Sequence, residues 1–176
     1  MTSLAVRLDD VPRLDGVRVL VVDDIPCMRE IVTEILTRDG AKVTSVSSAE
    51  GALAALQRER PDVLLSDLTM PGKGGYWLIG QVRALPPELG GVTPAAALTA
   101  HTGAEHRASV LRAGFQLHLG KPFDLDELID AVAILARKEY ARRSDQDPPA
   151  NEAQRALVET KLEILRQASF EFADGG

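Results

Sequence analysis

Cysteine is almost absent from this chain of 176 residues, in which Cys27 is the one thiol. A single cysteine excludes an intrachain disulfide and indicates a reducing compartment. We expect Cys27 to be a small helix residue, buried or half-buried, with a reactive thiol as the alternative.

Long apolar runs and clustered positive charge are missing as well. No apolar run reaches the roughly 18 residues of a membrane span, and no charged-then-apolar leader occurs. We therefore expect a cytoplasmic protein that does not contact a membrane. The formal net charge is −6. Nucleic-acid-binding surfaces need clustered Lys and Arg, so no nucleic-acid partner is expected.

The chain does contain a regular alternation of short apolar runs and amphipathic segments. Near-continuous apolar runs are typical of strands covered on both faces, and apolar residues at three-four spacing predict helices between them. Five strands alternating with five helices predict a doubly wound α/β domain with a parallel sheet. The expected strands are Val17–Val22, Lys42–Val46, Asp62–Ser66, Val92–Leu98 and Phe115–Leu119.

Capping residues indicate where three of these helices begin. Ser47 with Glu50 has the spacing of a capping box, and so has Thr102 with Glu105. Asp124 is expected to cap the fifth helix.

The predicted domain occupies only part of the chain. Residues 1–14 lack periodicity and are expected to form an extended lead-in to the domain at 15–143. The Pro-containing stretch 144–150 breaks the pattern and is interpreted as a linker. Residues 151–176 contain a further helix and a tail, too short for an independent domain. That helix would pack on the core, pair with a second copy in a homodimer, or bind a partner.

Acids and one lysine stand at the ends of three predicted strands. Asp23 and Asp24 follow the first strand, Asp67 follows the third, and Lys121 follows the fifth. Strand ends of one polarity converge on one edge of a parallel sheet, where ligands bind. Taken singly, each acid would be a helix cap or a loop charge. Crowded carboxylates, however, repel one another unless a cation joins them. The pattern therefore predicts a divalent-metal and phosphate site in a phospho-acceptor.

Four short segments together resemble a known family. They are Leu-Val-Val-Asp-Asp at 20–24, Leu-Leu-Ser-Asp-Leu-Thr-Met-Pro at 64–71, Ala-Leu-Thr-Ala at 97–100 and Gly-Lys-Pro-Phe at 120–123. Each stands at the end of a predicted strand. From Arg18 to about Arg143 the chain resembles a response-regulator receiver domain. The resemblance implies the flavodoxin-like fold, a five-stranded parallel sheet of order 2-1-3-4-5, here followed by an extra C-terminal helix.

The resemblance also implies a chemistry for the strand-end residues. Asp67 would accept a phosphoryl group from the phosphohistidine of a sensor histidine kinase or a phosphotransfer protein. Asp24 and Asp67 would ligate Mg²⁺ directly. Asp23 would act through water, and the backbone carbonyl of Thr69 would be a further ligand. Lys121 would pair with Asp67 at rest and with a phosphate oxygen afterwards. Such a protein catalyses only its own phosphorylation and dephosphorylation, so we do not expect a conventional enzyme.

Other positions of the resemblance concern the response to phosphorylation. Thr99 would hydrogen-bond the phosphoryl group and draw the following loop inward. The Lys121–Pro122 peptide bond is cis in the family, which would aim the lysine. Thr69, Ala100 and His101 stand where the family tunes the switch or the attack of water on the phosphoaspartate.

The chain departs from the family pattern at several positions. His118 replaces the usual Tyr or Phe of the switch; its imidazole could swing inward, or stay at the surface and pair with an acid. Gly74–Gly75 replaces an acid-glycine pair and, within the glycine-rich stretch 72–75, predicts a flexible turn and a looser loop beside the acceptor. His101 and His106 lack metal-ligand spacing, so no metal role is expected for them.

The favoured function is a phosphorelay receiver without a DNA-binding output domain. The residues after 150 are too few for one, so we expect signalling by contact with a downstream protein, through the fourth helix, fifth strand and fifth helix. A receiver of a hybrid sensor kinase is a variant, since residues 14–16 resemble such junctions. The rival function is a Mg²⁺-dependent aspartyl-phosphate phosphohydrolase. Such enzymes usually carry a second acid where this chain has Thr69, which counts against this function. A flavin-binding electron carrier shares the topology but would not need the acids.

Overall fold

The computed structural model describes the backbone of residues 13–144 and the side chains up to residue 137. Its sheet has five parallel strands in the order β2-β1-β3-β4-β5. The predicted doubly wound, flavodoxin-like topology is confirmed. The strands are β1 (Arg18–Val22), β2 (Lys42–Val46), β3 (Val63–Asp67), β4 (Ala95–Thr99) and β5 (Leu117–Gly120).

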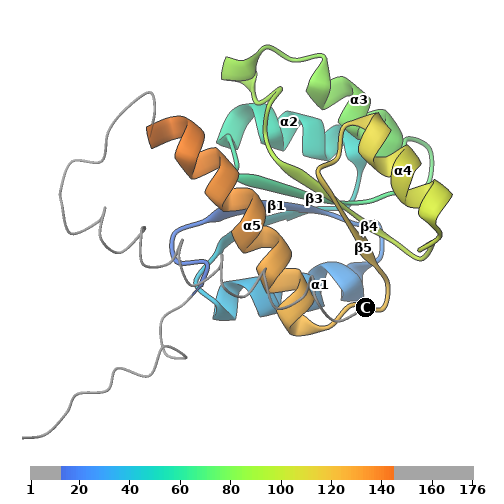
Figure 1. Ribbon diagram of the computed structural model, residues 1–176, viewed down its shortest axis with the longest axis horizontal. Helices are drawn as coiled ribbons and strands as arrows, with labels where there is room; N and C mark the ends of the chain where they lie inside the picture. Colours follow the sequence, from blue (N-terminus) through green and yellow to red (C-terminus); the bar gives the residue numbers. More distant parts are fainter. Residues whose placement is uncertain (1–12, 145–176) are drawn as a thin grey trace, which may run out of the picture. The chain divides into compact units, whose positions relative to one another are not determined.

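Helices cover both faces of the sheet within the described residues. Figure 1 shows α2, α3 and α4 on one face and α1 and α5 on the other. A short 3₁₀-helix, η2 (Pro87–Leu89), precedes β4. None of the helices in the described part of the chain has the length and apolar character of a membrane span. The helices are α1 (Pro26–Arg38), α2 (Ala49–Glu59), α3 (Gly75–Arg83), α4 (Ala104–Ala113) and α5 (Leu125–Ser144).

The chain divides into two compact units, Met1–Glu139 and Tyr140–Gly176. The predicted lead-in, linker and last helix fall almost wholly outside the described residues, and the domain boundaries therefore stay predictions. Leu14 is an exception, because its side chain is fully buried in the core of the first unit.

The core consists of two apolar layers, one on each face of the sheet. Successive side chains of a strand point to opposite faces, and β1 follows this rule. Leu20 and Val22 pack with residues of α2 and α3, whereas Val19 and Val21 pack with residues of α1 and α5. All four side chains are at most 1% exposed. This burial on both faces explains the near-continuous apolar run in the sequence.

Two of the three predicted helix caps are wrong. Ser48, not Ser47, is the N-cap of α2, where its hydroxyl accepts a hydrogen bond from the backbone N–H of Gly51. Gly103, not Thr102, is the N-cap of α4 and makes no side-chain cap bond. Both helices begin one residue later than predicted, because the polar residue just before each true cap also has the spacing of a capping box. The cap at Asp124 is confirmed: its carboxylate accepts from the N–H of Glu127 at 2.8 Å.

The last two strands begin later than predicted. Pro94 has no N–H to donate to the sheet, and η2 with its following turn occupies the residues before it. The N–H of Phe115 bonds to the carbonyl of Val110 at 3.4 Å, so this residue still belongs to the end of α4. Cys27 is exposed, contrary to expectation. It lies nine residues before the buried Leu36, and at about 100° per residue the two residues lie on opposite sides of α1.

Candidate functional site

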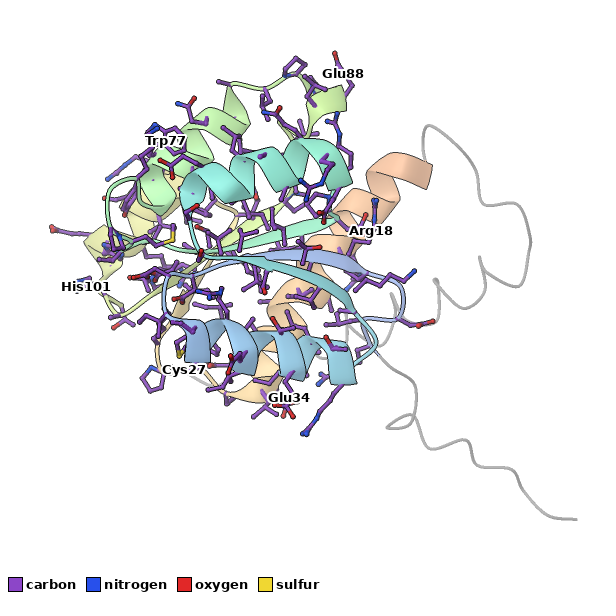
Figure 2. All side chains as sticks on the ribbon, turned by 180° about the vertical axis from the view of Figure 1, so that it is seen from behind. Arg18, Cys27, Glu34, Trp77, Glu88 and His101 are labelled. Carbon is purple, nitrogen blue, oxygen red and sulfur yellow. The ribbon has the colours of Figure 1, made fainter. Side chains whose placement is uncertain are left out.

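The register of the sheet brings the predicted site residues to one edge. Val22 pairs with Ser66, so Asp23 and Asp67 follow side by side at the ends of β1 and β3. Thr99 pairs with Gly120 at the ends of β4 and β5, immediately before Lys121. Figure 2 places His101, just beyond this edge, at the opposite end of the sheet from Arg18, which begins β1. The expected convergence of strand ends is therefore present.

The three acids form a compact group in which Asp23 and Asp67 are buried and Asp24 is half-buried. One carboxylate oxygen from each of Asp23, Asp24 and Asp67 lies within 4.8 Å of the others. Asp23 is 2% exposed and Asp67 is 6% exposed. Within the described residues, this is the one group of three or more ligating side chains close enough to hold a metal ion. Hard carboxylate oxygens in such a cluster suit Mg²⁺.

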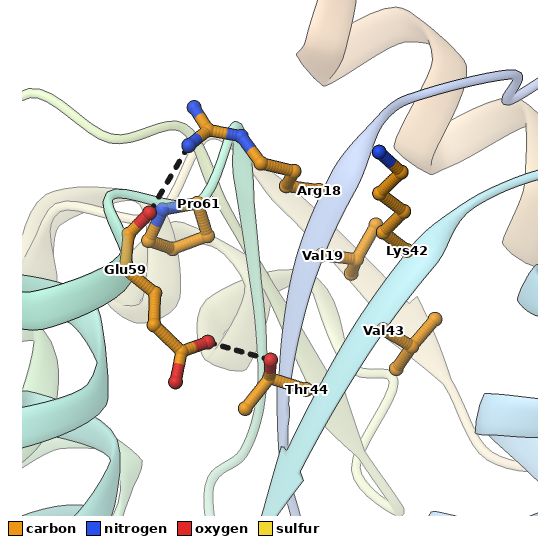
Figure 3. A pocket seen from close by; sticks show the side chains of 7 residues that line it. All are labelled: Arg18, Val19, Lys42, Val43, Thr44, Glu59 and Pro61. Atoms are coloured by element: carbon orange, nitrogen blue, oxygen red, sulfur yellow. Dashed lines mark hydrogen bonds between the residues drawn. The ribbon is translucent and has the colours of Figure 1, made fainter.

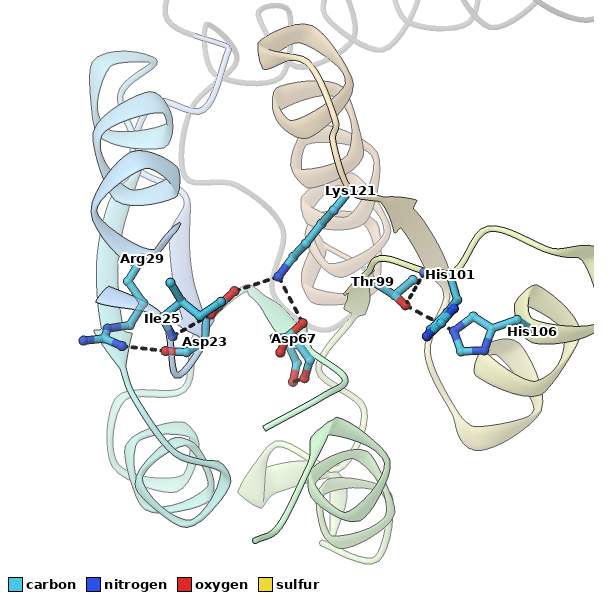
Figure 4. Close-up of polar contacts among 9 residues, drawn as sticks. Asp23, Ile25, Arg29, Asp67, Thr99, His101, His106 and Lys121 are labelled. Carbon is cyan, nitrogen blue, oxygen red and sulfur yellow. Dashed lines mark hydrogen bonds and ion pairs between the residues drawn. The ribbon is translucent and has the colours of Figure 1, made fainter. Parts of the chain in front are cut away.

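Lys121 joins two of these acids. Its Nζ donates to Oδ2 of Asp23 at 2.9 Å and to Oδ1 of Asp67 at 3.0 Å (Figure 4). The resting pair between Lys121 and Asp67 is thus present, and Asp23 is a second partner that the sequence did not reveal. The Lys121–Pro122 peptide bond is cis, as the resemblance implied.

Burial and the charge of Lys121 act in opposite directions on the pKa of Asp67. Desolvation raises the pKa of Asp67, the hydrogen bond and charge of Lys121 lower it, and the charges of Asp23 and Asp24 raise it further; the pKa stays above its ordinary value. For Lys121, burial alone would lower the pKa, but the hydrogen bonds and charges of Asp23 and Asp67 outweigh it and raise the pKa. The site therefore holds more negative charge than its one ammonium group neutralises, as a cation-binding site should.

Further contacts fix the loop that carries the first two acids. Oδ1 of Asp23 accepts from the N–H of Ile25 at 2.9 Å, and its carbonyl accepts from the Arg29 guanidinium at 2.7 Å (Figure 4). Sequence reasoning missed Arg29, although a basic residue one helical turn inside α1 is placed to reach back to the loop. The two carboxylate oxygens of Asp23 thus have different partners: Oδ1 accepts from the loop backbone and Oδ2 from Lys121.

The glycines beside Asp67 are tightly packed. A Cβ on Gly75 would lie 2.4 Å from the carbonyl oxygen of Asp67, and one on Gly74 would lie 2.6 Å from that of Leu68. The expectation of a looser, flexible loop is therefore wrong. Glycine is required there because the start of α3 approaches the backbone of the acceptor strand too closely for any side chain.

Thr99 does not face the acids in this structure. Its side chain is 2% exposed, and its hydroxyl oxygen accepts from the N–H of His101 at 3.1 Å and lies 3.3 Å from Nε2 of His106. Nε2 of His118 lies 2.9 Å from the carbonyl oxygen of His101, rather than beside an acid. The contact between Thr99 and His106 had no sequence signal. Ala100 and Thr69 are exposed, and the Thr69 carbonyl stays a predicted ligand.

A second concave region lies at the other end of β1 and β2. It has a volume of about 180 Å³ and is lined by Arg18, Lys42, Thr44 and Glu59 among others (Figure 3). Its polar groups largely bond to one another: the Thr44 hydroxyl donates to Glu59 at 2.6 Å, and Arg18 donates to the Glu59 carbonyl at 3.1 Å. The hydrogen bonds from Thr44 and then Arg58 lower the pKa of Glu59. Mutual pairing leaves little there for a ligand to bind.

Comparison with known sequences points to one family. The response regulator receiver domain family matches residues 19–133. An uncharacterized 14.6 kDa protein of Leptolyngbya boryana is 46% identical over 114 residues, covering 65% of this chain and 86% of that protein. The response regulator protein FleR of Pseudomonas aeruginosa PAO1 is 33% identical over 153 residues, covering 86% of this chain but 32% of FleR. The activities of such longer relatives as whole proteins do not transfer directly.

A solved structure agrees in fold. The receiver domain of the sensor histidine kinase PA1611 from Pseudomonas aeruginosa PAO1 has a magnesium ion coordinated in its active-site cleft. It matches with a TM-score of 0.63 and 31% identity, covering 69% of this chain and 98% of that domain. Because the family match runs from β1 into α5 and takes in every strand end described above, this chain belongs to the response regulator receiver domains of two-component signalling.

Proposed function

We propose that Asp67 is the phospho-acceptor of a phosphorelay and takes its phosphoryl group from a sensor histidine kinase or a phosphotransfer protein. The observation that supports this most is the position of Lys121, whose ammonium group joins two buried acids at 2.9 and 3.0 Å. A third acid completes a group that could hold Mg²⁺. A carboxylate held beside two cations is a competent nucleophile toward phosphorus, because they neutralise the charge that otherwise repels the phosphoryl group.

In this proposal each residue has a distinct role in the transfer. A carboxylate oxygen of Asp67 attacks phosphorus, an O–P bond forms, and the N–P bond of the phosphohistidine breaks with its electron pair returning to the imidazole. Asp24 and Asp67 would hold the Mg²⁺ ion, which supplies positive charge to the phosphoryl oxygens. Lys121 moves from the Asp67 carboxylate to a phosphoryl oxygen. The hydroxyl of Thr99 leaves its present partners and donates to the same group.

The proposed output is contact with a downstream protein in the cytoplasm, with neither nucleic acid nor a membrane as the partner. The surface of α4, β5 and α5 is the expected contact face. A receiver module of a hybrid sensor kinase is a specific alternative, supported by the similarity to the receiver domain of the sensor histidine kinase PA1611. A homodimer through the predicted helix after residue 150 stays a prediction, because that segment lies outside the described part of the chain.

Labelling with a small phosphodonor tests the acceptor. The full chain is incubated with acetyl phosphate and Mg²⁺, and its intact mass is followed together with Trp77 fluorescence. We expect one added phosphoryl group, with labelling abolished in Asp67→Asn and retained in the matched variant Glu30→Gln, which changes an exposed acid on α1. Labelling that survives Asp67→Asn would contradict the proposal. Rapid turnover of small phosphate esters would instead support the phosphohydrolase.

A further inference from the structure

The three histidines of the chain form one group: His118 lies on β5, His101 in the loop after β4, and His106 in α4. His106, in the first turn of α4, is the centre of the group. The centroid of its ring lies 5.5 Å from that of His101, 5.9 Å from that of His118 and 6.5 Å from that of Tyr76 in α3, each in an edge-on arrangement. The ring therefore contacts side chains from four separate segments, if the β4 residue Thr99 is included.

Polar contacts from this group hold the loop that follows β4. Nε2 of His118, on β5, lies 2.9 Å from the carbonyl oxygen of His101. The N–H of His101 donates to the Thr99 hydroxyl at 3.1 Å, and Nε2 of His106 lies 3.3 Å from the same oxygen (Figure 4). In the described part of the chain, these are the hydrogen-bond partners of that hydroxyl. Both belong to the loop or to α4, and neither belongs to the acidic group.

We propose that His106 is a positioning residue that holds the Thr99 hydroxyl in its resting place and thereby lowers the fraction of the protein that adopts the phosphorylated conformation. This inference rests on the proposed function, in which Thr99 must donate to the phosphoryl group on Asp67. The hydroxyl is buried, so it keeps a protein partner in whichever position it occupies. Leaving the resting place breaks the contact with Nε2, whichever of the two groups is the donor.

The energetic consequence follows from the difference between the two states. A contact made only at rest stabilises the resting state, and a ligand that selects the other state must overcome it. His106 is half-buried, so its nitrogen can bond to water once the hydroxyl has moved. The purely structural alternative is that the ring only fills space between α3 and α4. A phenyl ring would fill that space equally well, whereas a carboxamide would keep the polar contact but lose the ring.

Two substitutions separate these roles in the full-length chain. Beryllofluoride, which mimics the phosphoryl group, is titrated at saturating Mg²⁺ and followed by Trp77 fluorescence. His106→Phe should bind beryllofluoride about two- to tenfold more tightly, which is the effect of one net hydrogen bond. His106→Gln should stay within about twofold of the wild type, because its amide can replace Nε2. Glu105→Gln, a neighbouring exposed position on α4, is the matched control.

A second background keeps the test independent of repacking. In Thr99→Ala, which has no hydroxyl to hold, His106→Phe should change beryllofluoride affinity no further; a change as large as in the wild type would overturn the inference. Unchanged or weakened binding in His106→Phe, or equal tightening in His106→Gln, would also overturn it. Wild-type protein that does not bind beryllofluoride would overturn the proposed function and this inference together, whereas normal binding with an inert His106→Phe would overturn the inference alone.

Discussion

Removing the charge of Asp67 should make the Mg²⁺-free protein more stable, not less. The carboxylate attracts one ammonium group, since Nζ of Lys121 lies 3.0 Å from its Oδ1. It also repels two other carboxylates, those of Asp23 and Asp24, in a site with little access to solvent. Asparagine keeps the shape of the side chain and an oxygen that accepts from Lys121. Asp67→Asn therefore removes the repulsion while it preserves the hydrogen bond.

The distances give the size of the effect. At an effective dielectric constant of about 20, the pair at 3.0 Å attracts by about 5–6 kcal/mol. Each like-charge pair within 4.8 Å repels by about 3–4 kcal/mol on the same basis. The two repulsions together exceed the attraction by about 1–2 kcal/mol, and burial of the charge acts in the same direction. We expect Asp67→Asn to raise the free energy of unfolding by about 1–2 kcal/mol.

Urea unfolding followed by far-UV circular dichroism, with a chelator present, measures this change. Glu30→Gln removes one exposed negative charge from α1 and controls for net charge; it should change the stability by less than about 0.5 kcal/mol. Saturating Mg²⁺ should reverse the order, because the wild type gains binding energy and the variant has lost a ligand. Equal or lower stability of Asp67→Asn in chelator would refute the reasoning.

The same pair of proteins has a predictable dependence on pH. The pKa of Asp67 is raised in the folded state, so the folded protein binds this proton more readily than the unfolded chain. The stability that protonated Asp67 contributes to the folded wild type is fully present below the unfolded pKa and is lost as pH rises through the folded pKa. The advantage of Asp67→Asn in chelator should therefore be absent in acid and grow as the pH rises through this window. An advantage that does not change with pH would contradict the assigned cause.

Two further substitutions test the surroundings of the acceptor. Lys121→Ala removes the cation that joins two buried acids and should lower the free energy of unfolding by about 3 kcal/mol without Mg²⁺. Labelling by acetyl phosphate should remain possible. A Trp77 fluorescence response equal to that of the wild type would contradict the role of the lysine. Gly75→Ala would place a Cβ 2.4 Å from the carbonyl oxygen of Asp67. We expect a loss of about 1–3 kcal/mol in urea unfolding, whereas Gly80→Ala, where a Cβ meets nothing within 4 Å, should be neutral or stabilising and is the matched control.

Much of the fold could be predicted because it depends on patterns that repeat along the chain. Apolar runs and three-four spacing gave the five strands, the five helices within residues 13–144 and their alternation. The errors occurred at element ends. Ser48 and Gly103 are the N-caps although Ser47 and Thr102 have the spacing of a capping box, because that spacing does not fix a helix end to within one residue.

The glycines of the α3 loop were misinterpreted for a different reason. A run of glycines in a sequence is compatible with a flexible turn and with a close approach of two backbones, and composition does not distinguish these. At Gly75 the structure has the close approach, against the carbonyl of Asp67. The start of α3 therefore packs directly against the backbone at the end of β3.

The acids and the Thr99–His106 contact differ in what determines them. Parallel strands end at one edge of the sheet and β1 is the neighbour of β3, so Asp23 and Asp67 could be assigned to one site before any side chain was placed. Lys121 follows β5, which β4 separates from β3, and its long side chain bridges that distance to Asp67. His106 reaches Thr99 only because the loop between β4 and α4 has a particular length and α4 begins at Ala104. Each residue turns a helix by about 100°, so the side of α4 that faces the loop is not determined by strand order. In the proposed function, the groups for phosphoryl transfer come together because parallel strands end at one edge of the sheet, whereas the proposed control of the resting state depends on a local contact of this kind.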